Sequence, residues 1–114
     1  MEIDGLGKRV QVYIEEGERI NGKPLYLAIL ETLKAEGAAG GTVARGLAGF
    51  GAHGRIHTAH LVDLAAPLPL VVTWVDAPER VDRLLPIICD MVGEGLVTVD
   101  DVTIVKYTHR DAPK

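Results

Sequence analysis

The chain has 114 residues, which is enough for one domain and too few for two hydrophobic cores. Hydrophobic residues make up 47% and charged residues 25%, a composition that indicates a globular protein and excludes a disordered or fibrous one. With 12 Lys and Arg against 16 Asp and Glu, the formal net charge is −4, and the absence of a basic run disfavours a nucleic-acid groove.

Two features indicate the compartment. The first ten residues lack the apolar core of a signal peptide, and no apolar stretch is long enough to cross a bilayer, so we expect a soluble, cytoplasmic protein. The single cysteine, Cys89, cannot form an internal disulfide and follows the apolar run 86–88, so we expect a buried, inert thiol.

The first half of the chain predicts a strand, a helix and a second strand. Residues 8–16 alternate between apolar and polar side chains, the pattern of a half-buried strand. Residues 24–36 carry apolar side chains at helical spacing, with Pro24 suited to the first turn and Gly37 to a left-handed C-terminal cap. Residues 40–50 predict a strand rich in Gly and Ala, where the backbone approaches a neighbour or a ligand closely.

The second half predicts further strands with a helix between them. After a short strand piece at residues 61–64, the apolar run 70–75 predicts a central strand whose second face is buried by oligomerisation. Asp76 and Glu79 have the spacing of a capping box for the next helix. The last strand is expected over residues 97–107.

Prolines, glycines and a pair of acids predict where the elements of this second half bend or end. Pro86 inside the helix predicts a kink or an early break, and Gly93 and Gly95 are expected to end the helix. The pair Asp100 and Asp101 predicts a turn or a bulge within the last strand.

The element order is therefore β-α-β-β-α-β in a single domain over residues 1–114. At this length the simplest solution is a ferredoxin-like α+β fold. In that fold a four-stranded antiparallel sheet carries both helices on one face.

The stretch from Gly49 to Gly54 spells G-x-G-x-x-G, the fingerprint of a dinucleotide-binding loop. The residues that follow, RIHTAHLVDL, carry no helical stripe. Because the helix that would hold a pyrophosphate is missing, we do not expect a dinucleotide site.

The histidines of the same region leave two interpretations open. His53, His57 and His60 have helix-like spacing in a segment that does not look helical, with Asp63 as the nearest carboxylate. A divalent-metal site is therefore the weaker interpretation. We favour solvated loop histidines.

Three cations also have two interpretations each. For Arg45 we favour an ion pair at a sheet edge or a subunit interface over a ligand contact. Lys106 and Arg110 form either a solvated tail or an anion-binding strand end.

No catalytic residue can be assigned. The chain contains no serine, and the neighbouring acids at 15–16 and 100–101 point apart on strands. An enzyme is therefore not expected.

Several segments, in order, resemble the PII signalling proteins. Residues 40–51, GGTVARGLAGFG, look like the end of their second strand, where G-F-G precedes a long loop. Residues 68–88, LPLVVTWVDAPERVDRLLPII, look like their third strand and second helix. Residues 93–107, GEGLVTVDDVTIVKY, are most similar to an uncharacterised, stand-alone PII-like branch. The resemblance covers roughly residues 8–107.

This resemblance implies a homotrimer with ligand clefts between subunits, a mobile effector loop over residues 51–61 and a tail over residues 108–114. The G-D-G-K phosphate loop of true PII proteins is absent, and so is the loop tyrosine that is uridylylated in some of them. The implied ligand is a small anion, with an adenine nucleotide as the candidate. The residues placed against it are Gly49, Phe50, Gly51, His53, Gly95, Leu96, Val97, Thr98, Lys106 and Arg110.

The resemblance thus implies a regulatory protein whose 51–61 loop changes its contact with a partner when ligand binds. Genes of this branch often lie beside fluoride-exporter genes, which suggests a membrane transporter or channel as the partner. Nucleic-acid binding and membrane insertion are not expected. One alternative is a trimeric divalent-metal-binding protein similar to CutA, which would use His53, His57 and His60. The other is an enzyme of unknown chemistry on the same fold.

Overall fold

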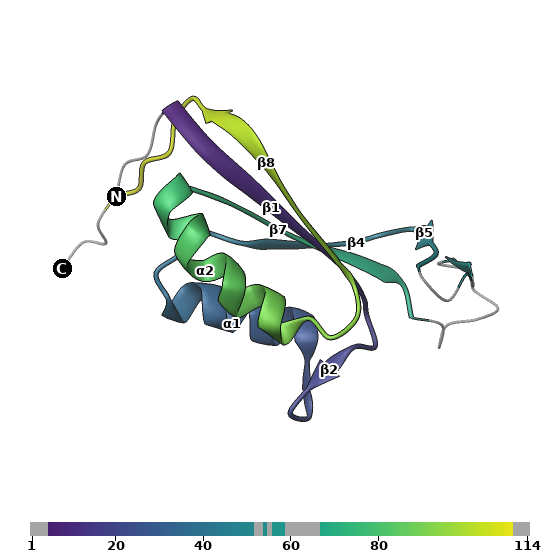
Figure 1. Cartoon of the computed structure of the whole chain (residues 1–114). Helices are drawn as coiled ribbons and strands as arrows, with labels where there is room; N and C mark the ends of the chain where they lie inside the picture. Colours follow the sequence, from purple (N-terminus) through teal and green to yellow (C-terminus); the bar gives the residue numbers. More distant parts are fainter. Residues whose placement is uncertain (1–4, 52–53, 55, 59–66, 111–114) are drawn as a thin grey trace.

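The computed structural model describes residues 5–51, 54, 56–58 and 67–110 of the chain. Within this part, two helices and eight strands form, several of the strands only two residues long (Figure 1). In chain order they are β1 (Gly5–Glu15), β2 (Arg19–Ile20), β3 (Lys23–Pro24), α1 (Leu25–Ala35), β4 (Thr42–Arg45), β5 (Ala48–Gly49), β6 (His57–Thr58), β7 (Pro69–Asp76), α2 (Pro78–Met91) and β8 (Leu96–Ile104).

Four strands form the central sheet in the order β4-β7-β1-β8, and every neighbouring pair is antiparallel. Both helices lie against the same face of this sheet (Figure 1). The main elements follow the order β-α-β-β-α-β, so the predicted ferredoxin-like α+β fold is confirmed. No helix in the described part of the chain is long and apolar enough to cross a membrane.

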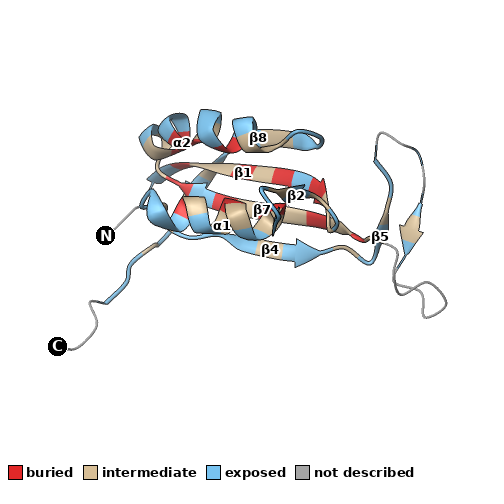
Figure 2. Ribbon diagram, turned by 90° about the horizontal axis from the view of Figure 1, so that it is seen from below, coloured by how far each residue is buried: buried red, intermediate tan, exposed pale blue. Residues whose placement is uncertain are grey.

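The core lies between the helices and the sheet. Because strand side chains alternate between faces, the even-numbered residues of β1 and β7 point toward the helices. Figure 2 shows buried residues along β1 and β7, while the edge strand β4 is mostly exposed. The buried cluster consists of Val10, Val12, Ile14, Leu70, Val72 and Trp74 from the strands and Leu25, Ile29, Leu33, Val81, Leu84 and Ile88 from the helices.

Helix α1 ends as the sequence predicts. Gly37 has a φ of 82°, in the left-handed region that glycine adopts without a steric penalty. The amide of Gly37 donates to the carbonyl of Lys34 at 3.2 Å, and that of Ala38 donates to the carbonyl of Leu33 at 2.9 Å. This pairing is the Schellman motif, and it directs the chain into the loop 37–41 that leads to β4.

Two predictions concern helix α2. The helix runs without interruption through Pro86 to Met91, so the early break does not occur, and the kink stays a prediction. Cys89 is exposed, although its neighbour Ile88 is fully buried, and the prediction of a buried thiol is wrong. A helix turns by about 100° per residue, so an apolar run along the sequence does not stay on one face.

The strand predicted over residues 40–50 is divided into β4 and β5. The division falls at Gly46, whose amide donates to the carbonyl of Pro69 at 2.7 Å. A Cβ on Gly46 would lie 2.8 Å from Cγ of Pro69, so the expected close approach of the backbone is confirmed. The short strand predicted at residues 61–64 lies outside the described residues.

The last strand is regular where a turn or bulge was expected. Strand β8 pairs with β1 in unbroken register from Leu96 to Ile104. Asp100 and Asp101 form ion pairs across the strands with Arg9 and Lys8, at 2.7 and 3.8 Å respectively. The prediction of a turn or a bulge at these acids is therefore wrong. The sequence did not reveal their ion pairs, because the partners are distant along the chain.

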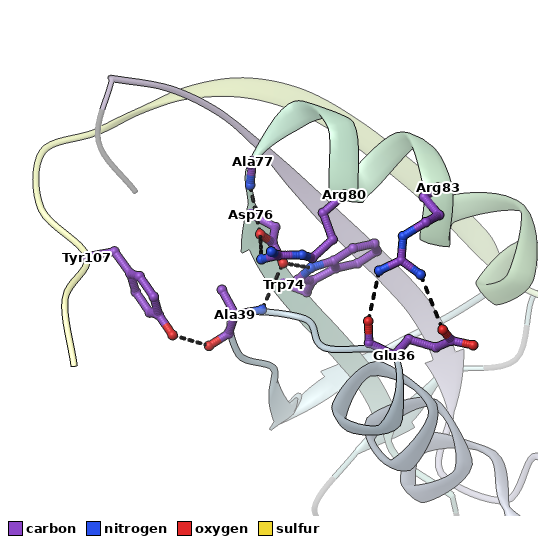
Figure 3. A network of polar contacts seen from close by, with 8 residues as sticks. All are labelled: Glu36, Ala39, Trp74, Asp76, Ala77, Arg80, Arg83 and Tyr107. Atoms are coloured by element: carbon purple, nitrogen blue, oxygen red, sulfur yellow. Dashed lines mark hydrogen bonds and ion pairs between the residues drawn. The ribbon is translucent and has the colours of Figure 1, made fainter. Parts of the chain in front are cut away.

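Asp76 has a larger role than the helix cap predicted for it. Its carboxylate has no exposed surface. Its Oδ1 accepts hydrogen bonds from the amide of Ala77 and from Nη1 of Arg80, both at 2.8 Å. Its Oδ2 accepts from the amide of Ala39 at 2.8 Å and from Nε1 of Trp74 at 3.1 Å (Figure 3). The carboxylate thus joins β7, α2 and the loop after α1.

The capping box itself does not form. Helix α2 is capped by Ala77, which makes no side-chain hydrogen bond to the helix.

Further along α2, Arg83 binds the end of α1. Its guanidinium donates a hydrogen bond to the backbone carbonyl of Glu36 at 2.9 Å and forms an ion pair with the carboxylate of Glu36 at 3.2 Å (Figure 3). The two helices are therefore joined by polar contacts as well as by the core.

We predict that Asp76→Ala lowers the free energy of unfolding by about 3–5 kcal/mol, because four donors lose their acceptor at a position with no exposed surface. Urea unfolding followed by circular dichroism measures this change. The control is Asp82→Ala on the exposed side of α2, which should change stability by no more than about 0.5 kcal/mol. Equal losses in the two variants would contradict the role given to Asp76.

Candidate functional site

A pocket of about 600 Å³ lies at one end of the sheet, where β1 ends and β7 and β8 begin. Its walls come from the end of β1, the region around β5 and β6, the start of β7 and the turn before β8. The lining residues are Tyr13, Ile14, Glu15, Glu18, Gly46, Ala48, Gly49, Phe50, Gly51, His57, Pro69, Leu70, Val71, Glu94, Gly95 and Leu96.

This pocket brings together two predicted ligand-binding segments that are far apart in the sequence. Residues 49–51 line one side, and Gly95 and Leu96 line another. Val97 and Thr98, predicted with them, continue β8 and are not among the residues that line the pocket. The strand order explains why the two segments lie at the same pocket, since β8 lies beside β1 and the chain around β5 lies beside the start of β7.

Gly95 allows the turn before β8 to pass close to β1. A Cβ on Gly95 would lie 2.6 Å from the carbonyl oxygen of Tyr13 and 3.1 Å from Cγ2 of Ile14. The carbonyl cannot move aside without disturbing β1, which is paired on both edges. Any side chain at this position would therefore displace a wall of the pocket.

The lining of the pocket is apolar and acidic. Phe50 and Leu96 contribute apolar walls, and Glu15, Glu18 and Glu94 contribute carboxylates. Among the described residues that line it there is no Lys or Arg. Like charges repel, so one chain's pocket does not by itself favour an anion, and positive charge would have to come from elsewhere.

The two predicted cations lie at the opposite end of the sheet. Strand β8 starts at the pocket and runs nine residues away from it, which corresponds to roughly 27 Å at the usual rise per residue of a strand. Lys106 and Arg110 come after its far end. Tyr107, between them, donates a hydrogen bond to the carbonyl of Ala39, which lies beside Asp76. One chain therefore does not bring Lys106 or Arg110 to its own pocket.

Part of the pocket wall lies on the face of the sheet that faces away from the helices. Odd-numbered residues of β1 and β7 and even-numbered residues of β8 point to this face. Tyr13 pairs with Val71 on one side and with Leu96 on the other, so the three lie side by side on it. All three also line the pocket.

Away from the pocket this open face is neutral. Arg9 donates to Asp100 through two bonds, Nε to Oδ1 at 3.1 Å and Nη2 to Oδ2 at 2.7 Å. The hydrogen bond and the charge of Asp100 raise the pKa of Arg9 above its ordinary value. Their neighbours on the face include the uncharged Gln11, Thr73 and Thr98. A face without net charge is suited to burial against another protein.

Arg45 lies on β4, an edge strand of the sheet. Its Nη2 is 2.9 Å from Oε1 of Glu16. The ion pair predicted for Arg45 at a sheet edge is confirmed.

Of the three predicted histidines, the structure describes His57. It is half-buried on β6 and lines the pocket. His53, His60 and the nearby Asp63 lie outside the described residues. In the part of the chain that is described, no group of three His, Cys, Asp or Glu side chains could hold a metal ion. The metal alternative stays a prediction.

Sequence reasoning did not find the acidic part of the pocket. Glu15 ends β1, Glu18 lies in the turn to β2, and Glu94 lies in the turn before β8. Each appears in the sequence as an ordinary solvated residue of a connection. They converge because β1 and β8 are neighbours in the sheet, so an acidic pocket can be predicted only when the strand order is known.

Comparison with known proteins agrees with this fold. Residues 7–104 match the family DUF190, described as "Uncharacterized ACR, COG1993". A UPF0166 protein of Methanocaldococcus jannaschii is 31% identical over 100 residues, which cover 87% of this chain and 92% of that protein. A UPF0166 protein of Aquifex aeolicus is 36% identical over 100 residues, which cover 86% of this chain and 92% of that protein.

A similar solved structure is that of CPII from Thiomonas intermedia K12, bound to ADP and bicarbonate. The two structures share a TM-score of 0.55 at 20% identity, over 87% of this chain and 88% of that one. The protein is thus a ferredoxin-like protein with a PII-like fold, and the predicted resemblance to PII-like proteins is confirmed. The chain belongs to the DUF190 family.

We predict that Gly95→Ala lowers the free energy of unfolding by about 1–3 kcal/mol, because the added Cβ collides with the carbonyl of Tyr13. Chemical denaturation measures the loss. Gly93→Ala is the matched control, since a Cβ there meets nothing within 4 Å. If both variants were equally stable, the close approach of β1 and the turn would be wrong.

Proposed function

We propose that this protein is a homotrimeric, cytoplasmic PII-like regulatory protein that binds a small anionic ligand at clefts between subunits. An adenine nucleotide is the first candidate. The observation that carries the proposal is that Tyr13, Val71 and Leu96 belong both to the pocket and to the open face of the sheet. A second copy that packs on this face closes the pocket and becomes part of its wall.

The distribution of charge supports a shared site. Glu15, Glu18 and Glu94 line the pocket, and no Lys or Arg does so among the described residues, so further positive charge would strengthen the binding of an anion. Lys106 and Arg110 of a neighbouring copy supply it when the far end of one β8 meets the pocket of the next subunit. Hydrogen bonds from such cations to phosphate oxygens are among the stronger ones in proteins. ADP and bicarbonate, the two molecules in the CPII structure, are both anions, which favours this class of ligand here.

Exposed apolar residues beside the pocket support a regulatory role, in which ligand binding changes the contact with a partner. Leu47, Phe50 and Ile56 lie around the β5–β6 hairpin, and each exposes between 67% and 78% of its surface. Exposed apolar side chains in one place mark a surface that contacts another molecule. Because Phe50 and Gly51 also line the pocket, ligand binding there changes the 51–61 loop and its contact with a partner. A membrane transporter or channel is the proposed kind of partner.

The assembly is tested by its mass in solution. We expect light scattering after size-exclusion chromatography to give about three times the 12.2 kDa of one chain. Val71→Arg should reduce this mass to that of the monomer, because it places an unpaired charge on the open face. Leu27→Arg, on a partly exposed position of α1, is the control and should keep the trimer. A monomeric wild-type protein would overturn the proposal.

Ligand binding is tested by calorimetric titration with ADP. We expect binding to the wild-type protein and a loss of about tenfold or more in affinity for Lys106→Ala and for Arg110→Ala, since each removes a charged hydrogen bond to phosphate. Lys34→Ala removes an exposed cation from α1 and should leave the affinity unchanged. Equal affinities in all four proteins would contradict the assignment of the cations.

Thermal unfolding of the wild-type protein and of His57→Ala, with Zn²⁺ or with ADP, tests the metal alternative. His57 lines the pocket, so a metal bound by His53, His57 and His60 would lie at this site. If Zn²⁺ raised the melting temperature, ADP did not, and His57→Ala removed the effect of Zn²⁺, a metal-binding protein similar to CutA would replace the proposed function.

A further inference from the structure

Tyr107 is one of the points that attach the segment with Lys106 and Arg110 to the rest of the protein, beside a backbone bridge at Thr108 and a contact of His109. Of residues 105–110, all of which the structure describes, Tyr107 is partly buried and the other five are exposed. Val105, the apolar residue before Lys106, exposes 88% of its surface. Apolar packing therefore contributes little to the position of this segment.

Two hydrogen bonds that share Ala39 connect Tyr107 to the buried Asp76. Its hydroxyl donates to the carbonyl of Ala39 at 2.6 Å (Figure 3). The amide of the same Ala39 donates to Oδ2 of Asp76 at 2.8 Å. A single residue of the α1–β4 loop thus connects the tyrosine to a carboxylate that has no exposed surface.

The acceptor for the tyrosine is a fixed point. The loop that contains Ala39 begins with the Schellman motif at Gly37. Just before it, the carbonyl of Glu36 accepts a hydrogen bond from Arg83 of α2 at 2.9 Å. Because the loop is tied to both helices and to Asp76, the carbonyl of Ala39 keeps its place and determines where the tyrosine lies.

We propose that Tyr107 is a positioning residue for ligand binding. Its hydroxyl bond to Ala39 holds Lys106 and Arg110 where they meet the phosphate groups of a ligand in the neighbouring subunit's pocket. The inference rests on the proposed function. Its physical basis is that a segment already held in place loses less conformational entropy when its cations bind.

The test uses Tyr107→Phe, which keeps the ring and removes the hydroxyl. We expect ADP to bind about fivefold more weakly, the effect of one neutral hydrogen bond, while the mass stays the same and the melting temperature falls by no more than about 5 °C. Hydrogen exchange at the amides of residues 105–110 should become faster, and exchange within β8 should not. The control is Tyr26→Phe, which removes the hydroxyl of another partly buried tyrosine, packed against the core on α1, and should change none of these.

A double-mutant cycle separates positioning from a purely structural role. If Tyr107 acts through Lys106, the variant with both Lys106→Ala and Tyr107→Phe loses less affinity than the sum of the two single losses. Additive losses, or unchanged exchange at residues 105–110, would overturn the inference while wild-type binding of ADP kept the proposed function. A wild-type protein that bound no ADP would overturn both.

Discussion

The carboxylate of Asp76, which has no exposed surface, is the contact on which the rest of this structure depends. A charge removed from water is costly unless hydrogen bonds satisfy it. Four donors do so here, from Trp74 on the same strand, from the start of α2 and from the loop after α1. Satisfying one carboxylate therefore holds three segments in a single arrangement, and the loop so held is the one to which Tyr107 binds.

The two ends of the sheet consequently have different chemistry. At the Asp76 end, polar contacts hold the loops and the segment with Lys106. At the other end lies the apolar and acidic pocket. One of its walls is the turn at Gly95, which passes so close to β1 that only glycine fits there. The regular register of β1 with β8 keeps the two ends apart within one chain. The anion site that we propose uses both ends, so it requires more than one copy of the chain, and we propose that the copies meet on the open face of the sheet.

Much of the fold could be predicted from the sequence, because its signals are local. Alternation in β1, helical spacing in α1 and the freedom of Gly37 each depend on residues within one element, and the structure confirms them. The predictions that were wrong depended on contacts across the fold. Two adjacent acids at 100–101 resemble a turn until strand pairing places them opposite Arg9 and Lys8. Cys89 follows an apolar run and is still exposed, because the helix turns it away from the core.

By itself the sequence determined the type and order of the main elements and the two glycine segments that line the pocket. Only the tertiary structure decided that these segments share one pocket, that Glu15, Glu18 and Glu94 line it, and that Lys106 and Arg110 lie far from it. Element type follows from the period of side chains along the chain. Which side chains converge follows from strand order and register, and these arise from contacts between residues that are distant in the sequence.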